Sequence, residues 1–310
     1  MRCRRRLGVL ALAVALTATG CGDPAATGSA DRDDTGGDAP TEYPLPFGLA
    51  QIPGTEPIGR PAIYDDVPYT YNGVPVTVRT LKAASRVTSS DPLSTFRAWV
   101  RQLEPLHLET LRVWSEPRET ARWIEAVGHP GGGGSPHGDT ASLQLWATDD
   151  GPILLVEITR ETEDGPVTTI QDDAGSPAAP TTVIESTGRR EAGDLLFEEQ
   201  GDEIHLPDGA VALMPTIPVP AGTGGSWSVF SAPDGRKAVE AMMDEASAMN
   251  PDESESGNRG ATPTAEATLD GIEIHTASFV ICCGGWGFRA VSVRGPGDAT
   301  ATVYVSSFAD

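Results

Sequence analysis

The sequence predicts an α+β fold made of two similar β-α-β-β-β units, each an antiparallel sheet with a helix packed on one face. Alternating apolar and polar residues indicate strands, as in Val74 to Leu81. An apolar helical stripe with the spacing 3, 4, 3 occurs once in each half of the chain. Turn residues between paired strand patterns, such as Asp149 to Pro152, indicate hairpins.

The first unit is expected to span residues 45–170. Its helix follows Asp91-Pro92, which supplies an N-cap and a proline in the first turn. The apolar stripe of this helix is Leu93, Phe96, Val100 and Leu103. A strand, a short second helix and a closing hairpin are predicted next, at residues 108–114, 116–127, 142–147 and 153–159.

The second unit, residues 195–310, is predicted to repeat this order after a linker at 171–194 that is poor in apolar residues. A strand at 227–230 precedes Asp234, which occupies a capping-box position. The second stripe is Val239, Met242, Ala246 and Met249. An acidic loop at 252–268 and strands at 271–281, 287–293 and 301–307 complete the prediction. We interpret the repeated order as a duplication, although an α+β chain can also show this order by chance.

The first twenty residues have the three parts of a secretory signal peptide. Four arginines precede an apolar run from Leu7 to Leu16, and small residues follow up to Gly20. The apolar run is shorter than the ~20 residues that a membrane-spanning helix needs. We therefore expect export and removal of residues 1–20.

The end of this segment, Ala18-Thr19-Gly20-Cys21, resembles the lipobox of bacterial lipoproteins. The resemblance covers residues 1–21 and implies cleavage between Gly20 and Cys21, with a diacylglyceryl thioether carrying palmitate-type chains on Cys21. Two acyl chains anchor a protein stably, whereas one holds it only marginally. The alternative is a secreted protein that is cut nearby and keeps a free cysteine.

The residues after the lipobox, 21–44, are small, acidic or rich in Pro and Gly, so they predict a flexible tether. The body is then expected on the outer face of the cytoplasmic membrane, held through the lipid at Cys21. The composition, rich in Ala, Gly, Pro and Asp with arginine far exceeding lysine, is similar to that of actinobacterial lipoproteins.

The chain is strongly acidic, with a net charge of −22. Four of its 22 basic residues lie in the leader, so the exported chain carries 18 basic and 44 acidic residues, a net charge of −26. Nucleic-acid binding requires clustered Lys and Arg and is excluded. We interpret the acidity as a solvated surface, with attraction of divalent cations or basic partners as the alternative.

No sequence motif points to a reaction. The chain lacks a Gly-x-Ser-x-Gly elbow, a His-Glu-x-x-His pair, a phosphate loop and a Cys-x-x-Cys pair. We therefore predict no catalytic residue, no cofactor and no metal site, and we expect a non-enzymatic binding or scaffolding protein with an envelope protein or a glycan as partner. A hydrolase that uses carboxylates and a carrier of a small ligand or lipid are the alternatives.

The adjacent pair Cys282-Cys283 is the most unusual feature of the body. Adjacent Cα atoms lie ~3.8 Å apart, closer than in ordinary disulfides, so a vicinal bridge needs a turn. Gly284-Gly285 permits one, and the alternative is one buried and one exposed thiol. Trp286 and Phe288 follow; core packing is expected for them, with a ligand surface as the alternative.

Overall fold

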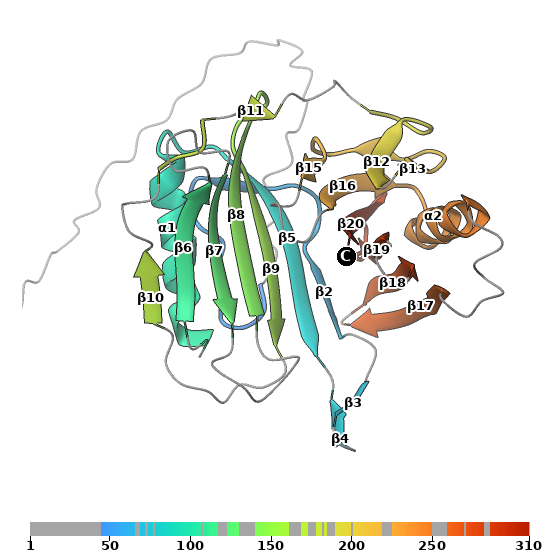
Figure 1. Ribbon diagram of the computed structural model, residues 1–310, viewed down its shortest axis with the longest axis horizontal. Helices are drawn as coiled ribbons and strands as arrows, with labels where there is room; N and C mark the ends of the chain where they lie inside the picture. Colours follow the sequence, from blue (N-terminus) through green and yellow to red (C-terminus); the bar gives the residue numbers. More distant parts are fainter. Residues whose placement is uncertain are drawn as a thin grey trace, which may run out of the picture. The chain divides into compact units, whose positions relative to one another are not determined.

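The computed structural model describes most of the body of the chain (Figure 1). The described residues are 45–65, 69–71, 74–76, 78–106, 108, 110–116, 123–129, 140–160, 169–172, 178–181, 183–184, 190–199, 201–218, 225–249, 259–269, 271–281 and 286–309. All of them belong to the compact unit Pro40–Asp310. The fold is α+β, as predicted: mostly antiparallel sheets, with two α-helices in the described part.

The first sheet has the strand order β1-β5-β9-β8-β7-β6-β10, with β2 beside β5 and β11 beside β8. Its strands are β1 (Thr55–Pro57), β2 (Ala62–Asp65), β5 (Arg79–Val87), β6 (Thr110–Glu116), β7 (Trp123–His129), β8 (Thr140–Thr148), β9 (Ile153–Arg160), β10 (Thr169–Asp172) and β11 (Val183–Ile184). Pairing is antiparallel except at β10 and β11, which run parallel to their neighbours.

The second sheet has the order β14-β16-β20-β19-β18-β17, with β15 also beside β16. Its strands are β14 (Val211–Ala212), β15 (Ile217–Pro218), β16 (Ser226–Ala232), β17 (Arg259–Leu269), β18 (Ile272–Ile281), β19 (Trp286–Arg294) and β20 (Ala301–Ala309). Two separate hairpins complete the β structure: β3 (Tyr69–Tyr71) with β4 (Val74–Val76), and β12 (Leu195–Glu199) with β13 (Asp202–His205).

Each sheet contains the same chain path around one helix. A strand, a helix and four strands follow one another as β5-α1-β6-β7-β8-β9 and as β16-α2-β17-β18-β19-β20. In space both sets have the first strand beside the fifth, then the fourth, third and second. Four strands therefore follow each helix, where the sequence prediction had three.

The additional strand is β7 in the first half, where a helix was predicted, and β17 in the second half, where a loop was predicted. The predicted helix at 116–127 is wrong, because β6 continues to Glu116 and β7 begins at Trp123. The aromatic and β-branched residues of β7 favour a strand, and a short apolar run fits either period. The predicted acidic loop at 252–268 is wrong in its second part, because β17 begins at Arg259. This edge strand is rich in Ala and Thr, so it carried little apolar signal.

The two helices follow the predicted stripes. Helix α1 (Pro92–Gln102) begins after Asp91, whose Oδ1 accepts the backbone N–H of Ser94 at 3.0 Å. Helix α2 (Gly235–Met249) begins after Asp234, whose Oδ1 accepts the N–H of Lys237 at 3.1 Å, so Asp234 is itself the cap. A 3₁₀ turn at Glu104–Leu106 follows α1. Neither described α-helix is long and apolar enough to cross a membrane.

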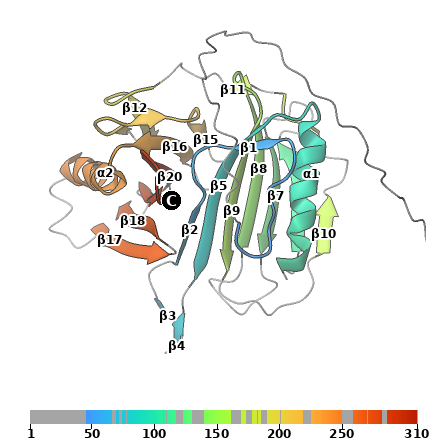
Figure 2. The same cartoon turned by 180° about the vertical axis from the view of Figure 1, so that it is seen from behind.

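Three apolar clusters hold the layers together. One lies between α1 and the first sheet, and another between α2 and the second sheet. The third joins the opposite faces of the two sheets and contains Tyr64, Trp146, Trp227 and Tyr304. The helices therefore lie on the outer faces and the sheets face each other between them, as Figures 1 and 2 show. In each half the helix covers one face of the sheet, and the sheet of the other half covers the opposite face.

Candidate functional site

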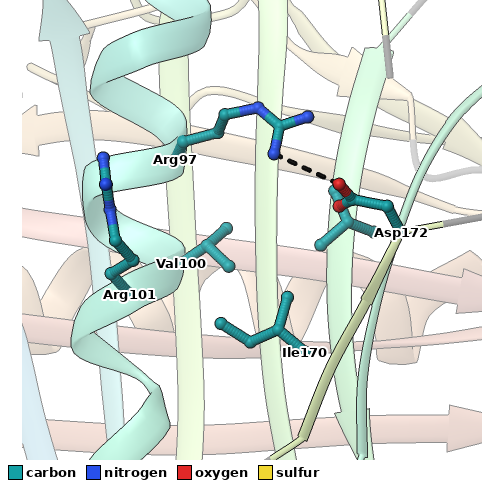
Figure 3. A pocket seen from close by; sticks show the side chains of 6 residues that line it. Arg97, Val100, Arg101, Ile170 and Asp172 are labelled. Atoms are coloured by element: carbon teal, nitrogen blue, oxygen red, sulfur yellow. Dashed lines mark hydrogen bonds and ion pairs between the residues drawn. The ribbon is translucent and has the colours of Figure 1, made fainter. Parts of the chain in front are cut away.

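A pocket of about 150 Å³ lies between α1 and the β10 edge of the first sheet (Figure 3). We call it the α1–β10 pocket. Helix α1, strand β6 and strand β10 contribute its lining residues, which are Arg97, Val100, Arg101, Val113, Ile170 and Asp172. The floor is therefore apolar, and the charged groups are two guanidinium groups and one carboxylate.

Local structure brings these side chains to one place. Arg97, Val100 and Arg101 are three and four residues apart on α1, so they share one helix face. The parallel pairing of β10 with β6 places Ile170 opposite Leu111 and Asp172 opposite Val113. Side chains two residues apart in a strand point to the same face, and Ile170 packs against the core beneath α1.

The two arginines of the pocket are in different electrostatic situations. Arg97 Nη1 lies 3.3 Å from Asp172 Oδ2, and both side chains are about one-third to two-fifths exposed, at 36% and 41%. Arg101 is exposed, and in the described part of the chain it has neither an ion pair nor a hydrogen bond. Its charge lies in the last turn of α1, where the helix dipole favours a cation. Within the described residues, one guanidinium is thus partly neutralised and the other has no counter-ion.

This combination suits the binding of an apolar group that carries a negative charge. The floor removes apolar surface from water, and a guanidinium pairs with a carboxylate or phosphate through two parallel hydrogen bonds. The lining residues include no histidine, cysteine or hydroxyl side chain, and their one carboxylate, Asp172, is paired with Arg97. The geometry therefore suits recognition of such a group.

A buried lysine lies between the sheets. Lys82 of β5 is 2% exposed, and its Nζ lies 3.0 Å from Glu157 Oε1. The same ammonium donates to Ser306 Oγ at 3.0 Å and lies 4.7 Å from the centroid of the Trp227 ring. Because Lys82 and Glu157 belong to the first sheet and the other two residues to the second, this group fastens the sheets together.

A histidine and two glutamates meet on the outer side of the second half. His205 Nδ1 lies 2.7 Å from Glu245 Oε1, and the backbone N–H of His205 donates to the other oxygen of Glu245 at 3.1 Å. Glu203 Oε2 lies 3.7 Å from His205 Nε2. These contacts attach β13 to α2. Glu245 and Glu203 contact opposite nitrogens of the His205 ring, and no group of three or more His, Cys, Asp or Glu side chains among the described residues is arranged so that it could hold a metal ion.

The described groups whose pKa values are clearly shifted lie outside the pocket, and each shift has a structural cause. The hydrogen bond from Arg60 holds the pKa of Asp298 below its usual value, and the N–H of Gly295 acts in the same direction. The N–H of Lys237 lowers the pKa of Asp234. Burial lowers the pKa of Arg190, whereas the hydrogen bond to Asp65 raises the pKa of Arg79. Both shifted carboxyl groups are held in the ionised form by fixed partners.

The sites that the sequence singled out are only partly covered by the structure. Gly20, Cys21, Cys282 and Cys283 lie outside the described residues. Trp286 and Phe288 are buried, at 2% and 0% exposure, which confirms the predicted core packing. They form an aromatic cluster with Phe197 and Phe279 at ring-centroid distances of 5.4 to 6.3 Å. Trp286 also donates its Nε1–H to Asp202 at 2.7 Å.

The α1–β10 pocket was not predicted from the sequence. Arg97 and Arg101 occupy positions where any amphipathic helix has polar residues. The segment 169–172 lies at the boundary between the predicted first unit and the predicted linker. The available signal was the pair of arginines four residues apart in a chain of net charge −22.

Comparison with known proteins gives no relative from which a site could be transferred: no protein-family model and no curated protein matches this chain.

Proposed function

We propose that this chain is a lipid-anchored, non-enzymatic binding protein on the outer face of the cytoplasmic membrane. The leader and the lipobox-like Ala18 to Cys21 support the location. The α1–β10 pocket carries the binding part of the proposal, because it combines an apolar floor with an available guanidinium in an otherwise acidic protein. Its ligand is an apolar group with an anionic end.

Recognition is better supported than hydrolysis by carboxylates. A catalytic acid needs an environment that raises its pKa towards neutrality. Among the described residues, the carboxyl groups of Asp234 and Asp298 have pKa values below the usual one, which is the opposite direction. A lipid carrier needs several hundred Å³ of apolar space, and the α1–β10 pocket has about 150 Å³.

We further propose that the two units arose by duplication. The shared path of strand, helix and four strands, with the same spatial order in both sheets, supports this origin. The unit is then β-α-β-β-β-β, one strand longer than the sequence pattern indicated.

Membrane attachment is tested by the Cys21→Ala substitution. We expect the unsubstituted chain to fractionate with membranes and to carry acyl groups on Cys21 by mass spectrometry. The variant should lose both properties. Firm membrane association of the variant would contradict the anchor.

Ligand binding at the pocket is tested by a photo-crosslinking amino acid placed at position 94 in intact cells, so that Arg97 and Arg101 stay in place. Ser94 is exposed and lies three residues before Arg97 on the same face of α1. Position 112 is the matched control, because Arg112 is exposed on the same strand as Val113 but points to the opposite face of the sheet. We expect a discrete crosslinked product from position 94 only. The same product from both positions, or none from 94, would contradict a binding role for the pocket.

A further inference from the structure

We propose that the α1–β10 pocket takes one apolar residue, with a carboxylate beside it, from an extended segment of a partner protein, and that this segment adds as a strand to the outer edge of β10. The inference rests on the proposed function of the pocket and adds the class of ligand. The volume of the pocket, the position of β10 at the edge of the sheet and the charges of Arg97, Arg101 and Asp172 support it.

The pocket has the size of a single side chain. Pockets for whole drug-sized ligands measure ~300–1,000 Å³, whereas ~150 Å³ holds a group about as large as benzene. The α1–β10 pocket, at about 150 Å³, therefore encloses one apolar side chain and leaves the remainder of a ligand outside. A polypeptide meets this condition, because one residue can enter while its neighbours lie on the surface.

The backbone next to the pocket is suited to hold such a polypeptide. Strand β10 ends the path of the first sheet and, among the described residues, pairs only with β6. An edge strand offers N–H and C=O groups that can accept a further strand. Side chains of the added strand would alternate, so every second one would point to the α1 side, as Ile170 and Asp172 do.

Strand β10 already shows the recognised pattern within this chain. Ile170 contributes to the apolar floor, and two residues later the Asp172 carboxylate reaches Arg97. Arg101 has no counter-ion in the part of the chain that the structure describes, so it remains for a second carboxylate. That carboxylate has two possible sources, a chain terminus or an Asp or Glu side chain, and both present the same two oxygens to a guanidinium.

The charge distribution makes this arrangement selective. Long-range repulsion from a chain of net charge −22 opposes the approach of any anion. This repulsion is screened beyond ~8 Å at physiological ionic strength, whereas a direct guanidinium contact acts at ~3 Å. A peptide is therefore retained only when its carboxylate reaches Arg101 while its apolar side chain enters the pocket.

The test measures binding of four fluorescein-labelled peptides to the purified full chain by anisotropy. The first ends in Gly-Ser-Thr-Thr-Val with a free carboxylate, and the second is its C-terminal amide. The third places Val-x-Glu inside an amidated peptide. The fourth is the better binder of the first and third peptides with its backbone amides methylated at alternate residues. Isovalerate serves as the small-molecule probe and is followed by NMR.

We expect the free-acid peptide or the internal Val-x-Glu peptide to bind, and the difference between them identifies the source of the carboxylate. The amide without a carboxylate should bind at least about tenfold more weakly, which corresponds to ~1.4 kcal/mol. Arg101→Gln should cause a similar loss, and the matched control Arg112→Gln should cause none. Methylation should abolish binding, because it removes the N–H groups of the added strand.

Two results would overturn the inference while leaving a ligand site in place. One is equally tight binding of isovalerate and the peptides, which would identify a small carboxylic acid as the ligand. The other is full binding of the methylated peptide, which would exclude strand addition. If neither peptides nor isovalerate bind, or if Arg101→Gln changes nothing, the proposed binding function of the pocket fails together with the inference.

Discussion

The two halves of this protein share one chain path but complete their helix-side cores in different ways. In the second half the hairpin β12–β13 covers the sheet beside α2, with Leu196, Phe197 and Ile204 fully or almost fully buried. Stacked and edge-on aromatic rings fill the space below it. In the first half the core below α1 is mostly aliphatic, and strand β10 extends the sheet at its edge.

The difference shows where a repeated architecture leaves room for a site. In the described part of the second half, apolar side chains of the hairpin β12–β13 cover the sheet beside α2, and we call this half sealed. The first half has a short parallel strand whose Asp172 reaches back to Arg97, and the space between strand and helix remains open as the pocket. Strand order is the same along both shared paths, so the elements that flank these paths account for the pocket in the first half.

The largest effect is expected from a cavity in the sealed half. Phe288 is 0% exposed and contacts three other aromatic rings. Phe288→Ala should lower the free energy of unfolding by ~3–5 kcal/mol, because the neighbouring rings cannot collapse fully into the space. Val113→Ala, beside the open pocket, should cost only ~1–2 kcal/mol, since two methyl groups are removed.

Urea unfolding monitored by circular dichroism measures both changes. Because the third apolar cluster joins the two sheets, we expect a single transition for each variant. A larger loss for Val113→Ala than for Phe288→Ala would contradict the contrast between a sealed and an open half.

The second effect concerns the contact between the halves. Lys82→Met removes a buried ammonium that reaches Glu157, Ser306 and Trp227. We expect a loss of roughly 1–3 kcal/mol, less than for a fully buried pair, because Glu157 is 31% exposed and can regain water. Thermal or urea unfolding provides the measurement.

The chain offers a matched control in its only other lysine. Lys237 is 80% exposed, so Lys237→Met should change the stability by less than ~0.5 kcal/mol. Equal effects of the two substitutions would show that the Lys82 contacts do not fasten the sheets.

The sequence was sufficient for features that depend on local pattern. The stripes through Phe96 and Val239 and the cap at Asp91 predicted both helices, because helical periodicity and capping are local properties. Strands β6 to β9 and β17 to β20 also lie largely where strands were predicted. The exceptions are β7, whose apolar run fits two periods, and β17, whose Ala- and Thr-rich sequence lacks an apolar face.

The pocket could not be predicted in the same way, because it depends on contacts distant in sequence. Arg97 and Asp172 are 75 residues apart, and no local pattern indicates that a four-residue strand pairs in parallel with β6. The face-to-face packing of the sheets is likewise non-local. Both faces of each sheet contribute residues to the buried clusters, so central strands such as β9 have long apolar runs that do not reveal what each face contacts.

The third effect is a pH dependence at the joint between the halves. Arg60 of the first half hydrogen-bonds to Asp298 of the second at 2.6 and 3.1 Å, and this lowers the pKa of Asp298. A carboxyl group with a lowered folded-state pKa stabilises the protein at neutral pH, and this stability is lost as the pH falls from the unfolded-state pKa, ~3.9, through the folded-state value.

Asp298→Asn should therefore cost ~1–2 kcal/mol at pH 7, and the deficit should shrink as the pH falls below about 4. Urea unfolding at a series of pH values checks this. Arg60→Gln should reproduce the trend, since it removes the main cause of the shift. A deficit that is constant from pH 7 to pH 2 would refute the assigned role of the ion pair.

The smallest effects on stability are expected from exposed ion pairs. One such pair involves α1 at the pocket, and a comparable pair lies on α2 away from the pocket. Asp172→Asn breaks the pair with Arg97 at the pocket, and Glu240→Gln breaks the pair with Arg236 on α2. Each should change the free energy of unfolding by less than ~1 kcal/mol, because exposed pairs gain little over hydration.

Only Asp172→Asn should tighten binding of a carboxylate peptide, since it leaves Arg97 beside Arg101 without its own counter-ion. Anisotropy of the labelled peptide measures binding to both variants. Tighter binding to Glu240→Gln as well would attribute the effect to the overall charge of the protein. Unchanged binding to Asp172→Asn would mean that Arg97 takes no part in recognition.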